Sequence, residues 1–294
     1  NGKVKEPLKK LRAAAPRAGR LDRNIGGAMK RTGRHKPTIE DVVEISGIEA
    51  LHPGGFALTK RTAEITGMRP GLRVLDVSSG RGTQSLYYAR EFGVVVVGID
   101  ISDDMVETAT ANAAEHNLAQ QVSFKQGDSQ HLPYDANSFD VVVNECAVGI
   151  PDDSQKVLNE MVRVAKPGGC IAVHESTWRR AIPPDDKTDI AERYGTTPLE
   201  HAEWMHMLEM AGVRNIVSEF EEWSRPEMFW KVRIDKDVRH YSQVLSLTEK
   251  TTTVYRIMKA YGIRGVVKAL LNEKHFYRAV IEGKLGYCLF KGIK

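Results

Sequence analysis

The sequence predicts an α/β protein with a seven-stranded, mostly parallel sheet and helices on both faces. From Gly71 onward, short runs rich in Val and Ile alternate with longer stretches of helical periodicity, which is typical of βαβ units. Several of these runs are apolar throughout, as expected of strands that helices cover on both faces. With 41% hydrophobic residues, the chain of 294 residues can fill the core that such a sheet requires.

Each strand is expected where a β-branched run is bounded by a turn or by a helical stretch. Helices are expected between the strands because apolar residues there recur every three or four positions. The expected strands are residues 73–77, 94–99, 122–126, 139–144, 170–175, 214–220 and 285–290. The expected helices of this region are residues 83–92, 103–117, 154–165 and 198–211.

Two segments outside the sheet have compositions of their own. Residues 1–36 are rich in Lys and Arg, contain only Glu6 and Asp22 as acidic residues and show no sustained apolar period, which predicts a basic arm. The segment before the last strand is aromatic, basic and helical in pattern, which predicts a cap whose aromatic residues form its own core rather than a substrate box. The predicted organisation is the arm over residues 1–37, N-terminal helices that close the site over 38–70, the core over 71–222, the cap over 223–283 and a last core strand over 284–294.

The cysteines and the longest apolar run exclude several classes of protein. Cys146, Cys170 and Cys288 lie far apart without a Cys-x-x-Cys pair, which argues against a structural zinc site and against a disulfide framework. The run from Val94 to Ile99 is far shorter than the ~20 apolar residues of a membrane-spanning helix, and no secretory signal is recognisable at the N-terminus. We therefore expect a cytoplasmic protein with no metal site and no transmembrane segment.

A nucleoside site is indicated where the first two strands end. Residues 74–82 read Val-Leu-Asp-Val-Ser-Ser-Gly-Arg-Gly, and such a glycine-bearing turn lets the backbone approach a ligand at the carboxyl edge of a sheet. Gly98-Ile99-Asp100 ends the second strand, where a carboxylate can accept both ribose hydroxyls of an adenosine. An NAD-binding domain is the alternative, but its Gly-x-Gly-x-x-Gly fingerprint is absent from this turn.

Two further elements follow in order along the chain. Residues 127–133 read Gly-Asp-Ser-Gln-His-Leu-Pro, and residues 163–169 read Arg-Val-Ala-Lys-Pro-Gly-Gly. Together with the two strand ends, they make the chain resemble the class I S-adenosylmethionine-dependent methyltransferases over roughly residues 54–211, in particular the small-molecule branch with the quinone and sterol methyltransferases. The resemblance implies a Rossmann-like fold, S-adenosylmethionine as cofactor and S-adenosylhomocysteine as product.

The resemblance also implies a set of cofactor-binding residues. The glycine turn would accommodate the amino-acid end of the cofactor and Asp100 the ribose. Ile101 would lie against the adenine, whose amine would donate a hydrogen bond to Asp128. Ser78 stands where the family usually has the first glycine of its loop, and serine fits there if its backbone keeps a negative φ. The whole set is Asp76, Ser78, Gly80, Gly82, Asp100, Ile101, Asp128, Ser129 and Asn144.

The acceptor is expected past the carboxyl ends of the fourth and fifth strands. Methyl transfer from a sulfonium is an in-line displacement, so an enzyme gains most by aligning the acceptor and by removing its proton where needed. Glu145 is either a group that steers the acceptor or a solvated strand end, and His174 is either a general base or a packed histidine. The expected catalytic residues are Glu175, His174 and Glu145, and the expected substrate-binding residues are His52, Phe56, Cys146 and Trp178.

The leading functional hypothesis is a methyltransferase that acts on a small-molecule acceptor. A nucleic-acid methyltransferase would use the basic arm for phosphate contacts, but residues 144–147 lack the Pro-Pro-aromatic run with which such enzymes stack a flipped base. A noncatalytic cofactor-binding protein is a third alternative, favoured by Ser78 and disfavoured by the otherwise complete binding set. Nucleic acid is therefore not expected as a partner, and a homodimer is left open.

Overall fold

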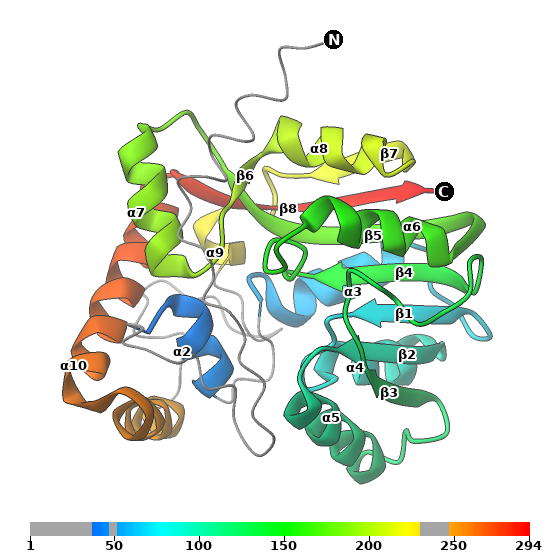
Figure 1. Cartoon of the computed structure of the whole chain (residues 1–294), viewed down its shortest axis with the longest axis horizontal. Helices are drawn as coiled ribbons and strands as arrows, with labels where there is room; N and C mark the ends of the chain where they lie inside the picture. The colour runs from blue at the N-terminus through cyan, green and yellow to red at the C-terminus, as the bar shows by residue number, and fades with distance from the viewer. Residues whose placement is uncertain (1–36, 47–51, 230–246) are drawn as a thin grey trace.

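The computed structural model describes residues 37–46, 52–229 and 247–294. Residues 1–36 of the predicted basic arm lie outside the described residues. So do residues 230–246 of the predicted cap, with its aromatic residues Trp230 and Tyr241. In the described part, an eight-stranded sheet crosses the molecule and helices lie on both of its sides (Figure 1).

The sheet has the strand order β3-β2-β1-β4-β5-β8-β7, with β6 paired to β5. The strand pairs from β3 through β5 are parallel, whereas β8 runs antiparallel to both of its neighbours. The prediction of a mostly parallel α/β sheet is confirmed, and the short β6 is an addition to it. The strands are β1 (Arg73–Val77), β2 (Val95–Asp100), β3 (Val122–Gln126), β4 (Phe139–Glu145), β5 (Ala165–Trp178), β6 (Leu199–Glu200), β7 (Arg214–Glu219) and β8 (Leu285–Ile293).

Alternate residues of the central strands pack against opposite layers of helices. Leu75 and Val142 belong to a buried cluster with residues of α6 and α8. Val74 and Val143 belong to a second cluster with residues of α4 and α5. This alternation follows from the two-residue period of a strand and leaves the sheet covered on both faces. The helices are α2 (Ile39–Ser46), α3 (Gly55–Ile65), α4 (Thr83–Phe92), α5 (Asp103–Glu115), α6 (Ser154–Val164), α7 (Pro184–Tyr194), α8 (His201–Met210), α9 (Pro226–Phe229) and α10 (Leu247–Ile281).

Helices α2, α7 and α10 contact one another and lie beyond the end of the sheet toward which β1 and β4 point (Figure 1). A third buried cluster joins them to the sheet through Ile39 of α2, Tyr194 of α7, Phe276 of α10 and Leu289 of β8. The helical character predicted for the cap is thus present in α10, which bends where Gly262 has non-helical dihedrals. This group of helices covers the carboxyl edge, where the parallel strands end.

Helix α7 forms where the sequence had suggested no element. Its start and end signals are ordinary: Pro184 lies in the first turn, Asp185 follows it, and Gly195 with φ 99° terminates the helix. Its buried face is short, because Ile190 and Tyr194 are the residues of this helix that become buried. Such a narrow apolar face gives too little periodicity to be recognised in the sequence.

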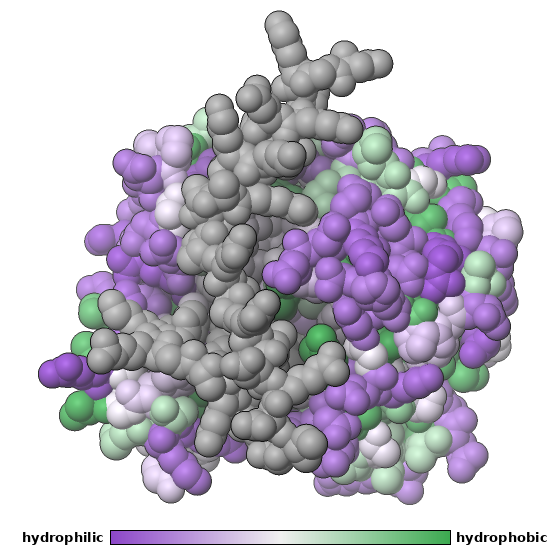
Figure 2. Space-filling model, viewed as in Figure 1, coloured by the Kyte–Doolittle hydropathy of each residue, from purple (hydrophilic) through white to green (hydrophobic). Residues whose placement is uncertain are grey.

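The described surface is mainly hydrophilic in the view of Figure 2, with smaller hydrophobic areas between the polar ones. α10 is the longest helix described, but charged residues such as Lys259, Arg264 and Lys268 recur along it. Among the described residues, no helix combines the length and the apolar character that crossing a membrane would require.

Candidate functional site

The turn after β1 needs its glycines for conformation and for space. Gly80 has φ 53° and Gly82 has φ 75°, both in the left-handed region that glycine adopts without strain. A Cβ atom on Gly82 would lie 2.3 Å from the ring of Phe124 in β3, so the missing side chain lets the start of α4 approach the sheet. The predicted contact of these glycines with the cofactor stays a prediction.

Asp100 joins the turn after β1 to the turn after β2. One carboxylate oxygen accepts the backbone N–H of Gly80 at 2.9 Å, and the other accepts the N–H of Ser102 at 2.9 Å. Burial raises the pKa of this carboxyl above its ordinary value, against the effect of these N–H groups. The carboxylate therefore lies at the carboxyl edge of the sheet, between the two turns that were predicted to bind a nucleoside.

The loop after β3 lies next to Asp100. The N–H of Gly127 donates to the Asp100 carbonyl at 2.9 Å, which places Asp128 beside the turn after β2. Asp128 accepts the N–H of Gln130 at 2.8 Å. Burial alone would raise the pKa of Asp128, but this bond and the contact with His131 bring it below its ordinary value. Ile101 is 54% exposed in the same region, so an apolar side chain and two carboxylates gather there.

Asn144 and Asp76 point inward and bind neighbouring protein groups. The Asn144 amide donates to the Val77 carbonyl at 3.0 Å and accepts the N–H of Ala147 at 2.9 Å. This side chain is fully buried and braces the ends of β1 and β4, and its predicted cofactor-binding role stays a prediction. Asp76 accepts the hydroxyl of Ser85 at 2.6 Å, and burial followed by the charge of Glu145 raises the pKa of Asp76 to about 8.

Ser78 does not keep the negative φ that was expected of it. Its φ is 63°, in the left-handed region where a side chain costs roughly 1–2 kcal/mol. We expect Ser78→Gly to raise the free energy of unfolding by up to about 1 kcal/mol, because relief of strain exceeds the entropy that glycine adds to the unfolded chain. Urea unfolding measures the change. The matched variant Ser79→Gly, at a buried neighbour outside the left-handed region, should lower stability, and a loss of stability in Ser78→Gly would contradict the expectation.

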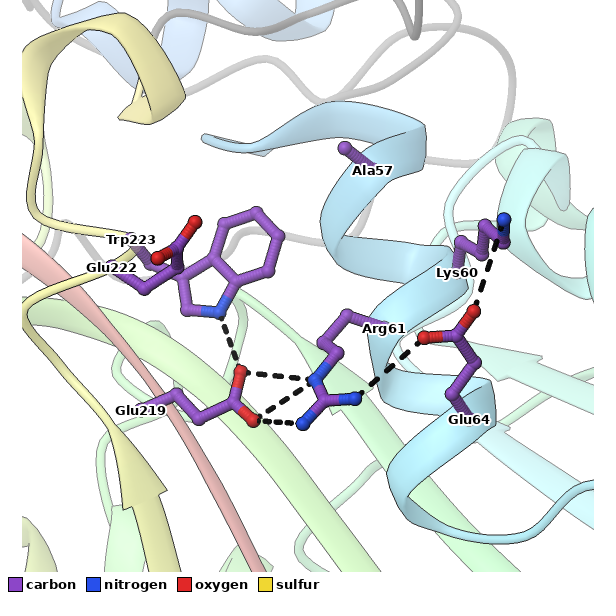
Figure 3. A pocket seen from close by; sticks show the side chains of 7 residues that line it. All are labelled: Ala57, Lys60, Arg61, Glu64, Glu219, Glu222 and Trp223. Atoms are coloured by element: carbon purple, nitrogen blue, oxygen red, sulfur yellow. Dashed lines mark hydrogen bonds and ion pairs between the residues drawn. The ribbon is translucent and has the colours of Figure 1, made fainter.

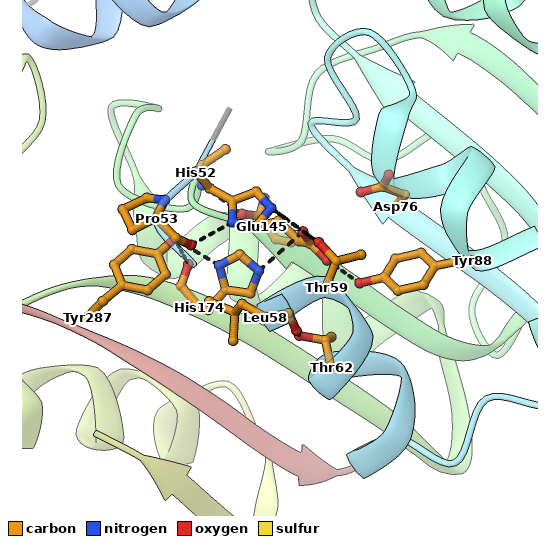
Figure 4. Close-up of polar contacts among 12 residues, drawn as sticks. His52, Pro53, Leu58, Thr59, Thr62, Asp76, Tyr88, Glu145, His174 and Tyr287 are labelled. Atoms are coloured by element: carbon orange, nitrogen blue, oxygen red, sulfur yellow. Dashed lines mark hydrogen bonds and ion pairs between the residues drawn. The ribbon is translucent and has the colours of Figure 1, made fainter. Parts of the chain in front are cut away.

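Three of the predicted acceptor-side residues meet in one buried cluster, which we call the His–Glu–His cluster: His52, Glu145 and His174 (Figure 4). Nε2 of His52 lies 2.8 Å from Oε2 of Glu145, and Nε2 of His174 lies 3.3 Å from the same oxygen. His52 precedes α3, Glu145 ends β4, and His174 lies on the neighbouring β5. Glu145 is therefore a buried strand end and not a solvated one.

The electrostatics of the cluster depend on burial and on opposing charge. Burial alone would raise the pKa of Glu145, but His174 and then His52 hold it well below its ordinary value. Burial lowers the pKa of His174 to about 4, although the charge of Glu145 acts in the opposite direction. At neutral pH the site therefore contains a carboxylate anion and a neutral His174 imidazole.

Sequence reasoning missed three hydroxyl groups that complete the cluster. Thr59 donates to Oε2 of Glu145 at 2.9 Å, and Tyr88 donates a short hydrogen bond to Oε1. The hydroxyl of Tyr287 lies 2.8 Å from Nδ1 of His174. These residues come from α3, α4 and β8 respectively, so no local pattern links them. His52 precedes α3 and Thr59 lies within it, and both side chains are buried.

The other predicted acceptor-side residues lie outside the cluster. Oε1 of Glu175 accepts the N–H groups of Val148 at 2.6 Å and Gly149 at 3.4 Å, and so anchors the loop after β4. Cys146 places its sulfur 3.9 Å from the Tyr194 hydroxyl, while Trp178 is buried with the helices beyond the sheet edge. Phe56 packs on Tyr87 with ring centroids 5.3 Å apart. Acceptor contacts for these four residues remain predictions.

The buried Glu175 gives a testable pH dependence. Burial raises its pKa from 4.5 to about 7, more than the N–H groups of Val148 and Gly149 lower it. The folded state thus binds the proton more tightly, and this stabilisation is present below pH 4.5 and lost as the pH rises through about 7. The glutamine of Glu175→Gln cannot ionise. As the pH rises from 4.5 to 7, the free energy of unfolding of this variant should therefore increase relative to that of the wild type, by at most about 3 kcal/mol.

Urea titrations of both proteins at a series of pH values test this expectation. Glu160→Gln is the control of opposite sign, because the Arg163 guanidinium lowers the pKa of Glu160 and its stabilisation is present at the higher pH. A constant stability difference between Glu175→Gln and the wild type from pH 4.5 to 7 would contradict the expectation.

A surface pocket lies on another side of α3 (Figure 3). Arg61 of α3 holds Glu219 of β7 through its Nε at 2.9 Å and its Nη2 at 2.6 Å, and the indole N–H of Trp223 donates to the same carboxylate at 3.1 Å. These contacts fix α3 against the end of β7. None of the predicted catalytic or binding residues lines this pocket, so we assign it to the anchoring of α3.

The fold and the site define a class of protein. A mostly parallel Rossmann-like sheet carries a glycine turn after β1 and an acidic residue at the end of β2, which is the arrangement of nucleoside-binding α/β domains. A second, buried polar cluster ends β4 at the same sheet edge. The architecture is that of an enzyme which holds a nucleoside-containing cofactor beside a second reactant.

Comparisons with known proteins narrow this class. A family described as a methyltransferase domain matches residues 68–224. The methyltransferase GfsG of Streptomyces halstedii is 32% identical over 188 residues, which cover 62% of this chain and 67% of that protein. The chain belongs to this methyltransferase family, and its class is that of the S-adenosylmethionine-dependent methyltransferases.

Two solved structures share the fold. The cyclase SpnF superposes with a TM-score of 0.70 at 24% identity, covering 88% of this chain and 97% of that one. A phosphoethanolamine N-methyltransferase of Haemonchus contortus, solved with S-adenosylhomocysteine and phosphomonomethylethanolamine, superposes with a TM-score of 0.69 at 18% identity and covers 89% of this chain and 59% of that one. At these identities the two structures support the fold alone.

Proposed function

We propose that this protein transfers the methyl group of S-adenosylmethionine to a small-molecule acceptor beside the His–Glu–His cluster. The observation that carries the proposal is the position of two polar groups at one sheet edge. Asp100 ends β2, between the turns that are predicted to bind the nucleoside, and Glu145 ends β4. Strand β1 lies between β2 and β4 and pairs with both. A cofactor with its ribose at Asp100 and its amino-acid end at the glycine turn would direct its sulfonium toward β4.

The residues of the cofactor side have separate roles in this proposal. The carboxylate of Asp100 accepts the ribose hydroxyls with lone pairs that Gly80 and Ser102 leave free. Asp128, with Ser129 beside it, accepts the adenine amine, and the exposed Ile101 covers the adenine ring. The positions of these residues at the carboxyl edge support the proposed contacts.

The acceptor side supports an in-line displacement. A lone pair of the acceptor forms a bond to the methyl carbon while the carbon–sulfur bond breaks. The electron pair of the broken bond stays on sulfur, which gives S-adenosylhomocysteine. The enzyme contributes by aligning the two reactants and by keeping water away from the sulfonium. The buried side chains of His52, Glu145 and His174 provide such a water-poor environment. A small acceptor suits the enclosure of this edge by α2, α7 and α10, while the homodimer and the cytoplasmic location stay predictions.

Parallel calorimetric titrations with S-adenosylmethionine, S-adenosylhomocysteine and NAD test the proposal. Saturable binding of the first two without binding of NAD is expected, followed by transfer of a labelled methyl group when a panel of hydroxyl, thiol and amine acceptors is supplied. Binding of NAD without binding of either sulfur compound would refute the proposal.

A further inference from the structure

In the His–Glu–His cluster, two imidazole nitrogens and a carboxylate oxygen lie close together. Nε2 of His52, Nε2 of His174 and a carboxylate oxygen of Glu145 all lie within 4.8 Å of one another. The three side chains are 1%, 0% and 4% exposed, respectively. What lies between these atoms depends on where the imidazoles carry their hydrogens.

The hydrogen of a neutral His52 is fixed on Nδ1. This nitrogen lies 2.8 Å from the carbonyl oxygen of Pro53, and a carbonyl oxygen can only accept a hydrogen bond. Nδ1 must therefore donate, and the neutral ring presents a lone pair at Nε2. That lone pair faces Oε2 of Glu145 at 2.8 Å and the Thr59 hydroxyl at 3.2 Å (Figure 4).

The hydrogen of His174 is fixed in the same way by Tyr287. The Tyr287 hydroxyl donates to the backbone carbonyl of His174 at 3.2 Å, so its oxygen accepts from Nδ1 at 2.8 Å. Nε2 again presents a lone pair. This buried nitrogen has no hydrogen-bond partner in the part of the chain that the structure describes, and it lies 3.3 Å from Oε2 of Glu145.

Glu145 is oriented by donors of its own. Tyr88 donates to Oε1 and Thr59 donates to Oε2, so the single hydrogen of the Thr59 hydroxyl is not available to Nε2 of His52 3.2 Å away. Two nitrogen lone pairs and an anionic oxygen thus converge in a dry site. Such a convergence is repulsive unless a positive charge lies between the atoms.

We propose that His52, Glu145 and His174 bind one divalent transition-metal ion through Nε2, Oε2 and Nε2. Two imidazoles and one carboxylate form a typical set for Zn²⁺ and for Fe²⁺. The separations of 2.8 and 3.3 Å from Glu145 are close to the ~3.3 Å expected between ligand atoms of a tetrahedral zinc site. The hydrogen bonds at both Nδ1 atoms are the outer contacts that metal-binding histidines usually make. This proposal replaces the expectation of no metal site, which rested on the cysteines.

Three protein ligands leave a coordination position for the acceptor. This step rests on the function proposed above. A hydroxyl or thiol bound there would lose its proton to water more readily, because the cation stabilises the resulting anion. The freed lone pair would then form the bond to the methyl carbon as the carbon–sulfur bond breaks. The substrate class that follows is an acceptor with an acidic O–H or S–H group.

Metal titration of the full chain, after removal of metals with a chelator, tests the proposal. We expect one equivalent of Zn²⁺ by calorimetry and one equivalent of Co²⁺ by its visible absorption. His52→Ala and His174→Ala should weaken binding by about a hundredfold or more, since loss of even an outer contact costs about 10–100-fold. The exposed His206→Ala is the matched control for adventitious surface binding and should bind as the wild type does.

Tyr287→Phe keeps the proposal falsifiable if the histidine variants do not fold. It removes a single hydroxyl that orients His174, and it should weaken Zn²⁺ binding by about 10–100-fold. Circular dichroism of each variant serves as the folding control. A folded wild type that binds no metal would overturn the proposal, as would metal binding that is equal in the wild type, His52→Ala and Tyr287→Phe. Loss of cofactor binding alone would count against the proposed function and leave the metal site standing.

Discussion

Asp100→Ala should bind S-adenosylmethionine between about a hundred and ten thousand times more weakly than the wild type. The substitution removes two charge-assisted hydrogen bonds to the ribose, each contributing about 1.5–3 kcal/mol. It also releases the N–H groups of Gly80 and Ser102, which hold the two edge turns at 2.9 Å from the carboxylate. Both effects act on the same ligand, so cofactor affinity should change more than any other property. Calorimetric titration with S-adenosylmethionine measures the effect.

A nearby carboxylate provides the control for Asp100. Asp103 is exposed in the first turn of α5, and Asp103→Ala removes a negative charge without touching the turns. Its cofactor affinity should equal that of the wild type. Circular dichroism establishes that both variants are folded. Unchanged affinity in a folded Asp100→Ala would remove the assignment of this edge as the ribose site.

Glu145→Gln should lower methyl transfer by about 10²–10⁴-fold while cofactor affinity stays unchanged. The amide keeps the volume of the side chain but lacks the charge that attracts a cation or a proton released by the acceptor. Groups that position or ionise a reactant typically contribute rate effects of this size. The split between turnover and binding is expected because Glu145 ends β4, away from the ribose site at the end of β2. Single-turnover transfer of a labelled methyl group measures the chemical step.

Glu221→Gln is the matched control for this variant. Glu221 is 79% exposed and pairs with Arg179. Glu221→Gln therefore removes the same charge at the surface and not in the buried His–Glu–His cluster. Its turnover should match that of the wild type. If Glu145→Gln retained full single-turnover activity, the His–Glu–His cluster would be structural and the acceptor would have to lie elsewhere on the edge.

Much of the fold was predictable because its strands are locally encoded. The bounds of β1 and β3 agree with the expected residues 73–77 and 122–126, since each of these segments is bounded by turn or loop residues. β5 begins at Ala165 rather than at residue 170 because Ala165 pairs with Phe139 of β4 across a register shift. That extension depends on a neighbour in space, which the local pattern does not report.

The candidate site was predictable as a set of residues but not as a geometry. Glu145 and His174 were indicated by their positions at or near strand ends, and His52 by the break before a helix. Their convergence on one oxygen depends on the register that aligns Glu145 with His174 and on the path of α3 across the sheet edge. Glu175, which was expected beside His174 among the catalytic residues, is its neighbour on β5, and successive strand residues face opposite sides. Its carboxylate accordingly binds the loop after β4.

The place of β8 in the sheet has a consequence for how the chain folds. β8 comes last among the described strands, yet it fills the gap between β5 and β7. β8 follows β5 by more than a hundred residues. Until β8 pairs, one edge of β5 and one edge of β7 are open. The entropy of closing so long a loop slows the pairing of β8. Open strand edges pair readily with other chains. We therefore expect aggregation during refolding to depend on how fast β8 pairs with β5 and β7.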